Sequence, residues 1–228
     1  MTAGRARAGT RLVIGMHFDL VCPWCFIGKR HLDVARARFE QLHPAVELQA
    51  TWHPVQLLPD VPPEGLPFAE FYTRRLGSAE AARQRREQVA SAARAAGLEL
   101  DLAAIARMPN TARAHRLLRR VAALGEPVLY EALLDRLFAA YFQRGEDIGD
   151  VAMLRALAAE FGVPQDRLGE AAPGDARLAW AGAAVPGVPH FVFDGHLALS
   201  GAHDADTLLE AMTQGTMQAP IAADAALA

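Results

Sequence analysis

The stretch that decides the fold is RLVIGMHFDLVCPWCFIGKRHL, residues 11–32. It opens on RLVIGMHFDL, residues 11–20, which has the composition of a β-strand bounded by a turn. After the turn, apolar residues recur at roughly helical spacing as far as residue 42. Cys22 and Cys25, the only cysteines in the chain, therefore lie where a strand is predicted to pass into a helix.

A second strand is predicted soon after this helix, because VELQATWH, residues 46–53, again has strand composition. Strand, helix and strand within about 40 residues form a parallel βαβ unit, whose crossover is almost always right-handed.

The middle of the chain has a different pattern. PVQLLPDVPPEGLPF, residues 54–68, is rich in proline and predicts a linker and a domain boundary. From there almost to residue 170 the apolar spacing is helical, with an Asn110–Thr111 cap, Pro127 at a first helical position and a cap at Asp150. We expect an all-helical unit here.

Strand patterns return near the C-terminus. HFVFDGHLALSG, residues 190–201, has two short apolar runs joined by Asp194 and Gly195, which is a strong hairpin signal. A last amphipathic helix is predicted to open at Asp204 or Asp206, and the residues after it are predicted to form a frayed tail.

The predicted fold class is therefore α/β: a thioredoxin fold, β-α-β followed by β-β-α, with a helical domain inserted between its two halves. The expected bounds are residues 11–60 for the N-terminal half, 61–174 for the helical insertion, 175–213 for the C-terminal half and 214–228 for a flexible tail.

Composition narrows the classes of function. The 228 residues are 52% hydrophobic with a formal net charge of -3, so no basic field would hold nucleic acid or an anionic membrane. The N-terminal segment lacks the apolar core and cleavage site of an export signal. We expect a cytoplasmic protein without nucleic-acid or membrane partners, in a compartment where disulfides are usually transient and catalytic.

The C-P-W-C motif predicts redox chemistry. Cysteines three residues apart at a helix start lie on one face of its first turn, close enough for a disulfide to form and break. Cys22 would face the positive end of the helix dipole and unpaired backbone amides, which stabilise a thiolate. Cys22 is therefore the expected nucleophile and Cys25 the resolving cysteine. Pro23 suits the first helical position, and Pro23 and Trp24 are expected to line the substrate site and tune the redox potential.

Two other interpretations of the motif stay open. A closed zinc site needs four ligands, and with no further cysteine two of them would have to be histidines or carboxylates. His17 and His31 lack ligand-type spacing to a second histidine, so no metal site is predicted. Two inert buried cysteines would have no need of a proline between them.

Three segments together resemble the DsbA-like thioredoxin superfamily, specifically its FrnE-type branch. They are FDLVCPWCFIGKRHL (18–32), NTARAHRLL (110–118) and GVPHFVFDGHLALSGAH (187–203). The resemblance runs over nearly the whole chain, and it implies a thioredoxin fold with a helical insertion.

The resemblance also implies roles for four residues. It places Pro189 in a cis-proline loop facing the active-site disulfide, with the backbone of Val188 offered to an extended substrate. Asn110 and His115 correspond to a pattern shared with 2-hydroxychromene-2-carboxylate isomerases and kappa-class glutathione transferases, where the helical domain helps to close the pocket over the thiol. From the residues alone, Asn110 is equally a helix cap and His115 a histidine at a helix interface.

The chain departs from these relatives at two informative points. The isomerases and kappa transferases typically have serine at the position of Cys22, so the retention of both cysteines favours dithiol chemistry. Export-type DsbA oxidases commonly have histidine at the position of Trp24, a difference that argues against periplasmic disulfide formation as the role of this chain.

The expected function is a thiol–disulfide oxidoreductase that acts on protein or small-molecule thiols and disulfides through a mixed disulfide. It needs no bound cofactor, and glutathione is expected as a redox partner or cosubstrate if it takes part at all. The alternatives are a glutathione-dependent isomerase or transferase for a small aromatic or polyketide-like molecule, and a chaperone-like binding module.

Overall fold

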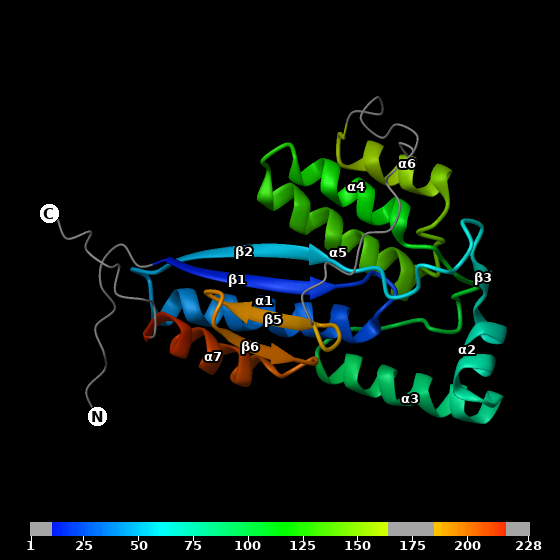
Figure 1. Ribbon diagram of the computed structural model, residues 1–228, viewed down its shortest axis with the longest axis horizontal. Coiled ribbons are helices and arrows are strands. Elements are labelled where there is room, and N and C mark those ends of the chain that lie inside the picture. The colour runs from blue at the N-terminus through cyan, green and yellow to red at the C-terminus, as the bar shows by residue number, and fades with distance from the viewer. Residues whose placement is uncertain (1–10, 164–184, 218–228) are drawn as a thin grey trace, which may run out of the picture. The chain divides into compact units, whose positions relative to one another are not determined.

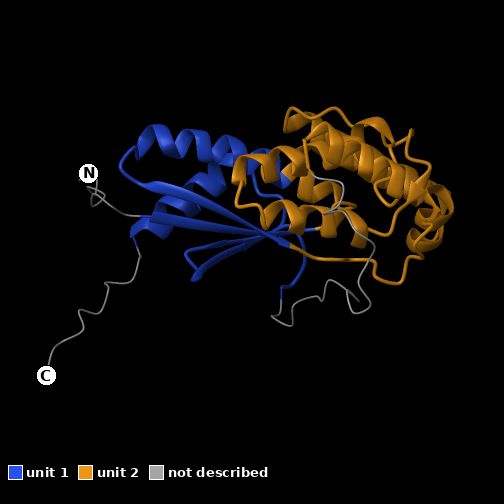
Figure 2. Ribbon diagram, turned by 90° about the horizontal axis from the view of Figure 1, so that it is seen from above, with its two compact units in different colours: residues 1–18, 28–53, 185–228 blue, residues 19–27, 54–184 orange. Residues whose placement is uncertain are grey.

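The computed structural model describes residues 11–163 and 185–217 (Figure 1). The chain divides into two compact units (Figure 2): unit 1 comprises residues 1–18, 28–53 and 185–228, and unit 2 residues 19–27 and 54–184. The predicted boundary at residue 174 and the predicted tail beyond residue 217 lie outside the described residues.

Unit 1 is built on a four-stranded sheet in the order β2-β1-β5-β6. Strand β5 is antiparallel to β1 and to β6, and the arrows of β1 and β2 point the same way in Figure 1. This is the predicted parallel unit followed by the predicted hairpin. The strands are β1 (Arg11–Phe18), β2 (Glu47–Pro54), β5 (His190–Phe193) and β6 (Leu197–Ser200).

The strand register separates the two faces of this sheet. Ile14 pairs with Phe193 and Met16 with Phe191, so these four side chains share one face. All four are at most 1% exposed. Alternate residues of β1 and β5 therefore form the core of unit 1.

Two helices cover this apolar face, α1 (Pro23–Leu42) and α7 (Ala205–Met217). A Cβ on Gly28 of α1 would lie 3.2 Å from Phe191, and one on Gly215 of α7 would lie 3.4 Å from Phe193. The absence of a side chain at each glycine lets the helix approach the sheet closely.

Helix α7 runs past its predicted end. Residues 214–217, assigned to a flexible tail from the sequence, belong to the helix. Gly215 is buried against Leu12 and Phe193, so packing on the sheet holds a last turn that the sequence pattern had not indicated.

Unit 2 is mainly helical, and its helix starts follow the predicted signals. Pro127 is the first residue of α5, and the Asp150 carboxylate accepts the Met153 N–H at 2.8 Å to cap α6. In the part of unit 2 that the structure describes, the helices lying wholly within the unit are α2 (Phe68–Leu76), α3 (Ala79–Ala95), α4 (Ala112–Ala122), α5 (Pro127–Arg144) and α6 (Val151–Glu160).

The expectation of an all-helical middle region is wrong at one place. Strand β3 (Leu66–Pro67) pairs antiparallel with β4 (Arg107–Met108). The Arg107 guanidinium also donates to the Glu64 carbonyl at 2.8 Å. Strands of two residues have no periodicity to detect, so this pairing could not be predicted from the hydrophobic pattern.

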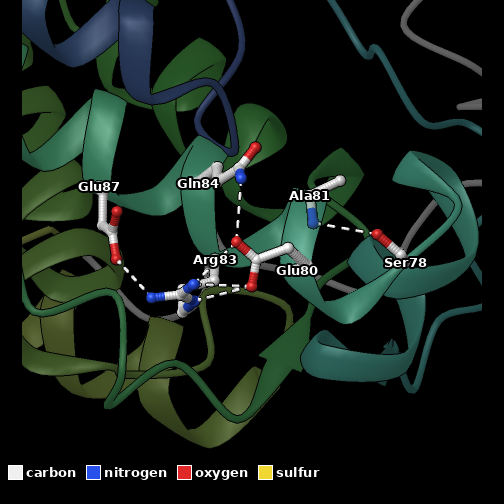
Figure 3. A network of polar contacts seen from close by, with 6 residues as sticks. All are labelled: Ser78, Glu80, Ala81, Arg83, Gln84 and Glu87. Carbon is white, nitrogen blue, oxygen red and sulfur yellow. Dashed lines mark hydrogen bonds and ion pairs between the residues drawn. The ribbon is translucent and has the colours of Figure 1, made fainter.

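Local polar contacts line the N-terminal half of helix α3 (Figure 3). The Ser78 hydroxyl accepts the Ala81 N–H at 3.0 Å, and the Arg83 guanidinium donates to the Glu80 carboxylate at 2.7 Å. These contacts lie on a solvated face, as the arginine-rich sequence predicts.

Helix α1 is 20 residues long but carries charged side chains, Lys29 and Asp33 among them. Within the two described ranges, no helix combines the length and the apolar character needed to cross a membrane.

Candidate active site

Cys22 and Cys25 lie in unit 2, where a turn leads into α1. The Cys22 N–H donates to the Asp19 carbonyl at 3.1 Å, and the Cys25 N–H donates to the Cys22 carbonyl at 3.0 Å. Helix α1 begins at Pro23, so the proline occupies the predicted first helical position. Both thiols therefore belong to one helical turn, with Cys22 immediately before the helix.

The two thiols differ in exposure and acidity. Cys22 is 7% exposed and Cys25 is fully buried, and no disulfide joins these two described cysteines. Burial raises the pKa of Cys25 well above its ordinary value, and the hydrogen bond and charge of Cys22 raise it further. Cys25 therefore carries its proton at neutral pH, as expected of a resolving cysteine before it attacks.

Trp24 and Pro23, between the cysteines, are both partly exposed. The next residue, Phe26, stacks on Phe138 with ring centroids 5.1 Å apart and on Phe142 at 6.1 Å. These aromatic contacts fix the first turn of α1 against α5 within unit 2.

Asp19 is a site residue that the sequence analysis missed. It is fully buried. Its carboxylate accepts the N–H of Leu20 at 2.7 Å and that of Leu57 at 2.8 Å. The sequence did contain a signal for this residue: Asp19 lies between the apolar Phe18 and Leu20, three positions before the C-x-x-C motif. Because buried carboxylates are rare, an acidic residue in such an apolar stretch indicates a special role.

His115, proposed from the resemblance, is fully buried on α4. Its Nε2 lies 2.8 Å from Oδ1 of Asp19. The structure thus joins His115 to the turn that bears the cysteines.

Asn110 is held by hydrogen bonds of a structural kind. Its Oδ1 accepts the Ala112 N–H at 3.0 Å and the Gln56 amide at 2.8 Å, and its Nδ2 donates to the Val61 carbonyl at 2.5 Å. Thr111 occupies the N-cap position of α4 without a side-chain cap bond, and Asn110, one residue earlier, accepts the first N–H of the helix instead. A role of Asn110 in substrate binding stays a prediction.

Tyr72, on α2, is a second residue that the sequence did not single out. Burial raises the pKa of its hydroxyl and the charge of Cys22 raises it further, whereas Arg75 and Arg85 lower it. Tyr72 is one of several tyrosines on amphipathic helices, and no sequence signal marks it as a neighbour of the thiol.

Val188 and Pro189 lie in unit 1, and the peptide bond between them is cis. Pro189 is buried, and its Cγ lies 3.0 Å from the position a Cβ would take on Gly28 of α1. Gly28 follows Cys25 by three residues along the same helix. Contact of Val188 with a substrate stays a prediction.

A search for metal sites covered the described part of the chain. In that part, no group of three or more His, Cys, Asp or Glu side chains could hold a metal ion.

Comparisons with known proteins agree with this architecture. The DSBA-like thioredoxin domain model matches residues 13–213. A crystal structure described as a probable DsbA oxidoreductase from Streptomyces coelicolor is 27% identical and covers 92% of each chain, with a TM-score of 0.77. The cytosolic disulfide reductase DsbM from Pseudomonas aeruginosa, solved with GSH, is 17% identical over 90% of this chain and 96% of its own, with a TM-score of 0.56, and shares the fold.

Among curated proteins, the uncharacterized protein YwbO of Bacillus subtilis (strain 168) is 25% identical over 150 residues. The match spans 66% of this chain and 66% of YwbO. Since the family model covers most of the sequence, the chain belongs to the DsbA-like thioredoxin domain family.

Proposed function

We propose that this protein is a thiol–disulfide oxidoreductase in which Cys22 is the nucleophile and Cys25 resolves the mixed disulfide. The observation that carries the proposal is the inequality of two thiols within one helical turn. Cys22 is the more exposed and sits at the helix start, whereas Cys25 is fully buried and its pKa is raised. A helix start favours a thiolate, so the geometry suits attack by Cys22 first.

The reaction follows from thiol–disulfide exchange. The Cys22 thiolate attacks a substrate disulfide, one sulfur of which leaves as a thiolate while the other forms a mixed disulfide with Cys22. Cys25 then loses its proton and attacks Sγ of Cys22, which releases the second substrate thiolate and forms the Cys22–Cys25 disulfide. Two electrons pass to the substrate, and the reverse sequence oxidises a dithiol.

Glutathione is the small thiol that we expect to exchange with this pair, and no bound cofactor is required. The similar structure of DsbM was solved with GSH and is described as a cytosolic disulfide reductase. That likeness supports glutathione as a redox partner, and a cytoplasmic setting for this protein. Larger thiol and disulfide substrates, including proteins, would use the same chemistry.

A redox titration tests the proposal. The purified chain is equilibrated in graded glutathione buffers, alkylated and weighed intact. We expect one two-electron transition between dithiol and disulfide, absent from Cys22→Ser, whereas Cys25→Ser accumulates a mixed disulfide with glutathione. His196→Gln, on an exposed loop, should titrate like the wild type.

Failure to form the Cys22–Cys25 disulfide at any glutathione ratio would overturn the proposal. Saturable, non-covalent glutathione binding that survives replacement of both cysteines would then point to the isomerase or transferase alternative. Calorimetry on the double Cys22→Ser, Cys25→Ser variant measures that binding directly.

A further inference from the structure

Three side chains act on the surroundings of Cys22 but have no part in the exchange described above. They are Tyr72 and Arg75 on α2 and Arg85 on α3. The Tyr72 hydroxyl interacts with the charges of Cys22, Arg75 and Arg85, and all four residues belong to unit 2. Because such interactions weaken with distance, one hydroxyl lies within range of the nucleophile and of two cations.

Helix α2 fixes the position of Tyr72. The Phe68 N–H donates to the Ala106 carbonyl at 3.0 Å, which ties the start of the helix to the β4 segment. The ring of Tyr72 packs on that of Phe68, with centroids 4.7 Å apart, and on that of Phe71 at 5.6 Å. Arg75 follows Tyr72 by three residues, so the two side chains lie on one face of α2.

The turn between α2 and α3 adds Arg85 to this group. Helix α2 ends at Gly77, whose φ of 87° suits glycine, and Ser78 then caps α3. The two helices pack against each other. Tyr72 is therefore near one arginine from its own helix and one from the next.

The acidic residues at the start of α3 are already engaged (Figure 3). The Arg83 guanidinium donates to the Glu80 carboxylate at 2.7 Å and lies 3.5 Å from that of Glu87. Arg85 donates instead to the neutral side-chain oxygen of Gln88 at 3.0 Å. The charge of Arg85 is therefore not cancelled by its own helix.

Tyr72, Arg75 and Arg85 are left as donors for a ligand. Within residues 11–163 and 185–217, no carboxylate pairs with either arginine and no group hydrogen-bonds with the Tyr72 hydroxyl. Both arginines are exposed and Tyr72 is partly exposed. Burial is the first cause of the raised pKa of Tyr72, so its hydroxyl keeps its proton at neutral pH and can donate it in a hydrogen bond.

We propose that Tyr72, Arg75 and Arg85 bind a carboxylate of the substrate and thereby select disulfides that carry a negative charge a few bonds from the sulfur that Cys22 attacks. Arginine suits this task, because its planar guanidinium can donate two parallel hydrogen bonds to one carboxylate. The three residues bind the anion and exchange no proton or electron with it. The inference rests on the proposed oxidoreductase function, to which it adds a substrate class: disulfides of carboxylate-bearing thiols.

Linear disulfides of similar length test this selection. They are 3,3′-dithiodipropionate, bis(2-hydroxyethyl) disulfide and cystamine, which are anionic, neutral and cationic at neutral pH. The reduced full-length protein is mixed with an excess of each, quenched with acid and weighed intact, and the loss of the reduced form gives the rate. Each rate is divided by that of 2-mercaptoethanol with the same disulfide, which removes the intrinsic reactivity of the reagent.

We expect the wild type to prefer the anionic to the cationic disulfide about tenfold at low salt, and less at high salt, because ions screen the attraction. Arg75→Gln and Arg85→Gln should each lower this preference about threefold, and the double variant should remove it. Arg85→Lys keeps the charge and should keep most of the preference. Tyr72→Phe removes one hydrogen bond and should slow only the anionic disulfide, by about threefold.

Arg94→Gln is the matched control. Arg94 is exposed on the same helix, nine residues after Arg85 and therefore about 13 Å further along the axis. This variant loses the same charge, so an effect of net charge alone would appear in it too. We expect it to keep the wild-type preference.

A wild type without charge preference would overturn the proposal. So would folded variants, checked by thermal unfolding, that keep the wild-type preference, or a loss in Arg94→Gln as large as in Arg85→Gln. A slowdown that is equal for all the disulfides would show an effect on Cys22 or on the fold and would overturn it as well. If no disulfide oxidises the reduced wild type, the proposed oxidoreductase function fails before this inference is reached.

Discussion

At the scale of single residues, the thiol of Cys25 has the most strongly altered chemistry in the motif. Burial is the first cause of its raised pKa, and Cys22 adds to it. In the reduced protein labelled with ¹³C at cysteine Cβ, we expect the Cys25 resonance to titrate well above the ordinary thiol value of about 8.5. A Cys25 resonance that titrates at or below that value would contradict the burial seen here.

The same spectrum tests the neighbour of Cys25. Asp19→Asn removes a negative charge that raises the pKa of Cys25, so the pKa should fall. A lower pKa alone would supply more thiolate and speed the resolving step. An unchanged Cys25 pKa in Asp19→Asn would contradict this effect of the Asp19 charge.

At the scale of elements, the start of α3 depends on one side-chain cap. The Ser78 hydroxyl accepts the Ala81 N–H at 3.0 Å (Figure 3). Ser78→Ala should lower the free energy of unfolding by about 1 kcal/mol and raise amide exchange in the first turn. Ser91→Ala, on an exposed position of the same helix, is the matched control and should be neutral or slightly stabilising.

Two glycines provide a matched test of how α1 and α7 pack on the sheet. A Cβ on Gly28 would meet the rigid ring of Pro189 at 3.0 Å, whereas one on Gly215 would meet the flexible end of Leu12 at 3.1 Å. Gly28→Ala should destabilise the protein by about 1–3 kcal/mol in urea unfolding.

Gly215→Ala should be nearly neutral, because Leu12 can move and alanine gains about 1 kcal/mol in helix propensity. Equal effects of the two substitutions would contradict the expected difference between a rigid and a flexible neighbour.

At the scale of the whole molecule, three histidines make stability depend on pH. On the sheet of unit 1, the ring of His17 lies 4.6 Å from that of His53 and 5.7 Å from that of His190. Burial, followed by the charges of the other two, lowers the pKa of His17 to about 4. Burial also lowers the pKa of His53 and of His190.

A lowered histidine pKa means that the unfolded chain binds more protons than the folded chain between about pH 4 and 6.5. The free energy of unfolding should therefore fall as pH drops through this window. After allowance for solvent screening, we expect a loss of about 1 kcal/mol between pH 7 and pH 5, measured by urea unfolding. His17→Gln should flatten this dependence and the exposed-loop variant His196→Gln should not.

Much of unit 1 could be predicted because its signals are local. The turn at Asp194 and Gly195 has both residues at positive φ, 47° and 75°, which is what a tight hairpin demands and why Asp-Gly is so informative. The two-residue strands β3 and β4 and the last turn of α7 escaped prediction. They depend on partners from distant segments rather than on their own pattern.

The sequence by itself determined the local geometry of the motif: two cysteines one helical turn apart, with a proline that starts the helix, between a strand and an amphipathic pattern. These features are local, because spacing within a helix sets which side chains share a face. Only the tertiary structure decided what surrounds the thiols. Asp19 and His115 are 96 positions apart, and pairing over such a distance depends on how helices pack, which no local propensity encodes. The same packing buries Cys25 and makes the two thiols unequal.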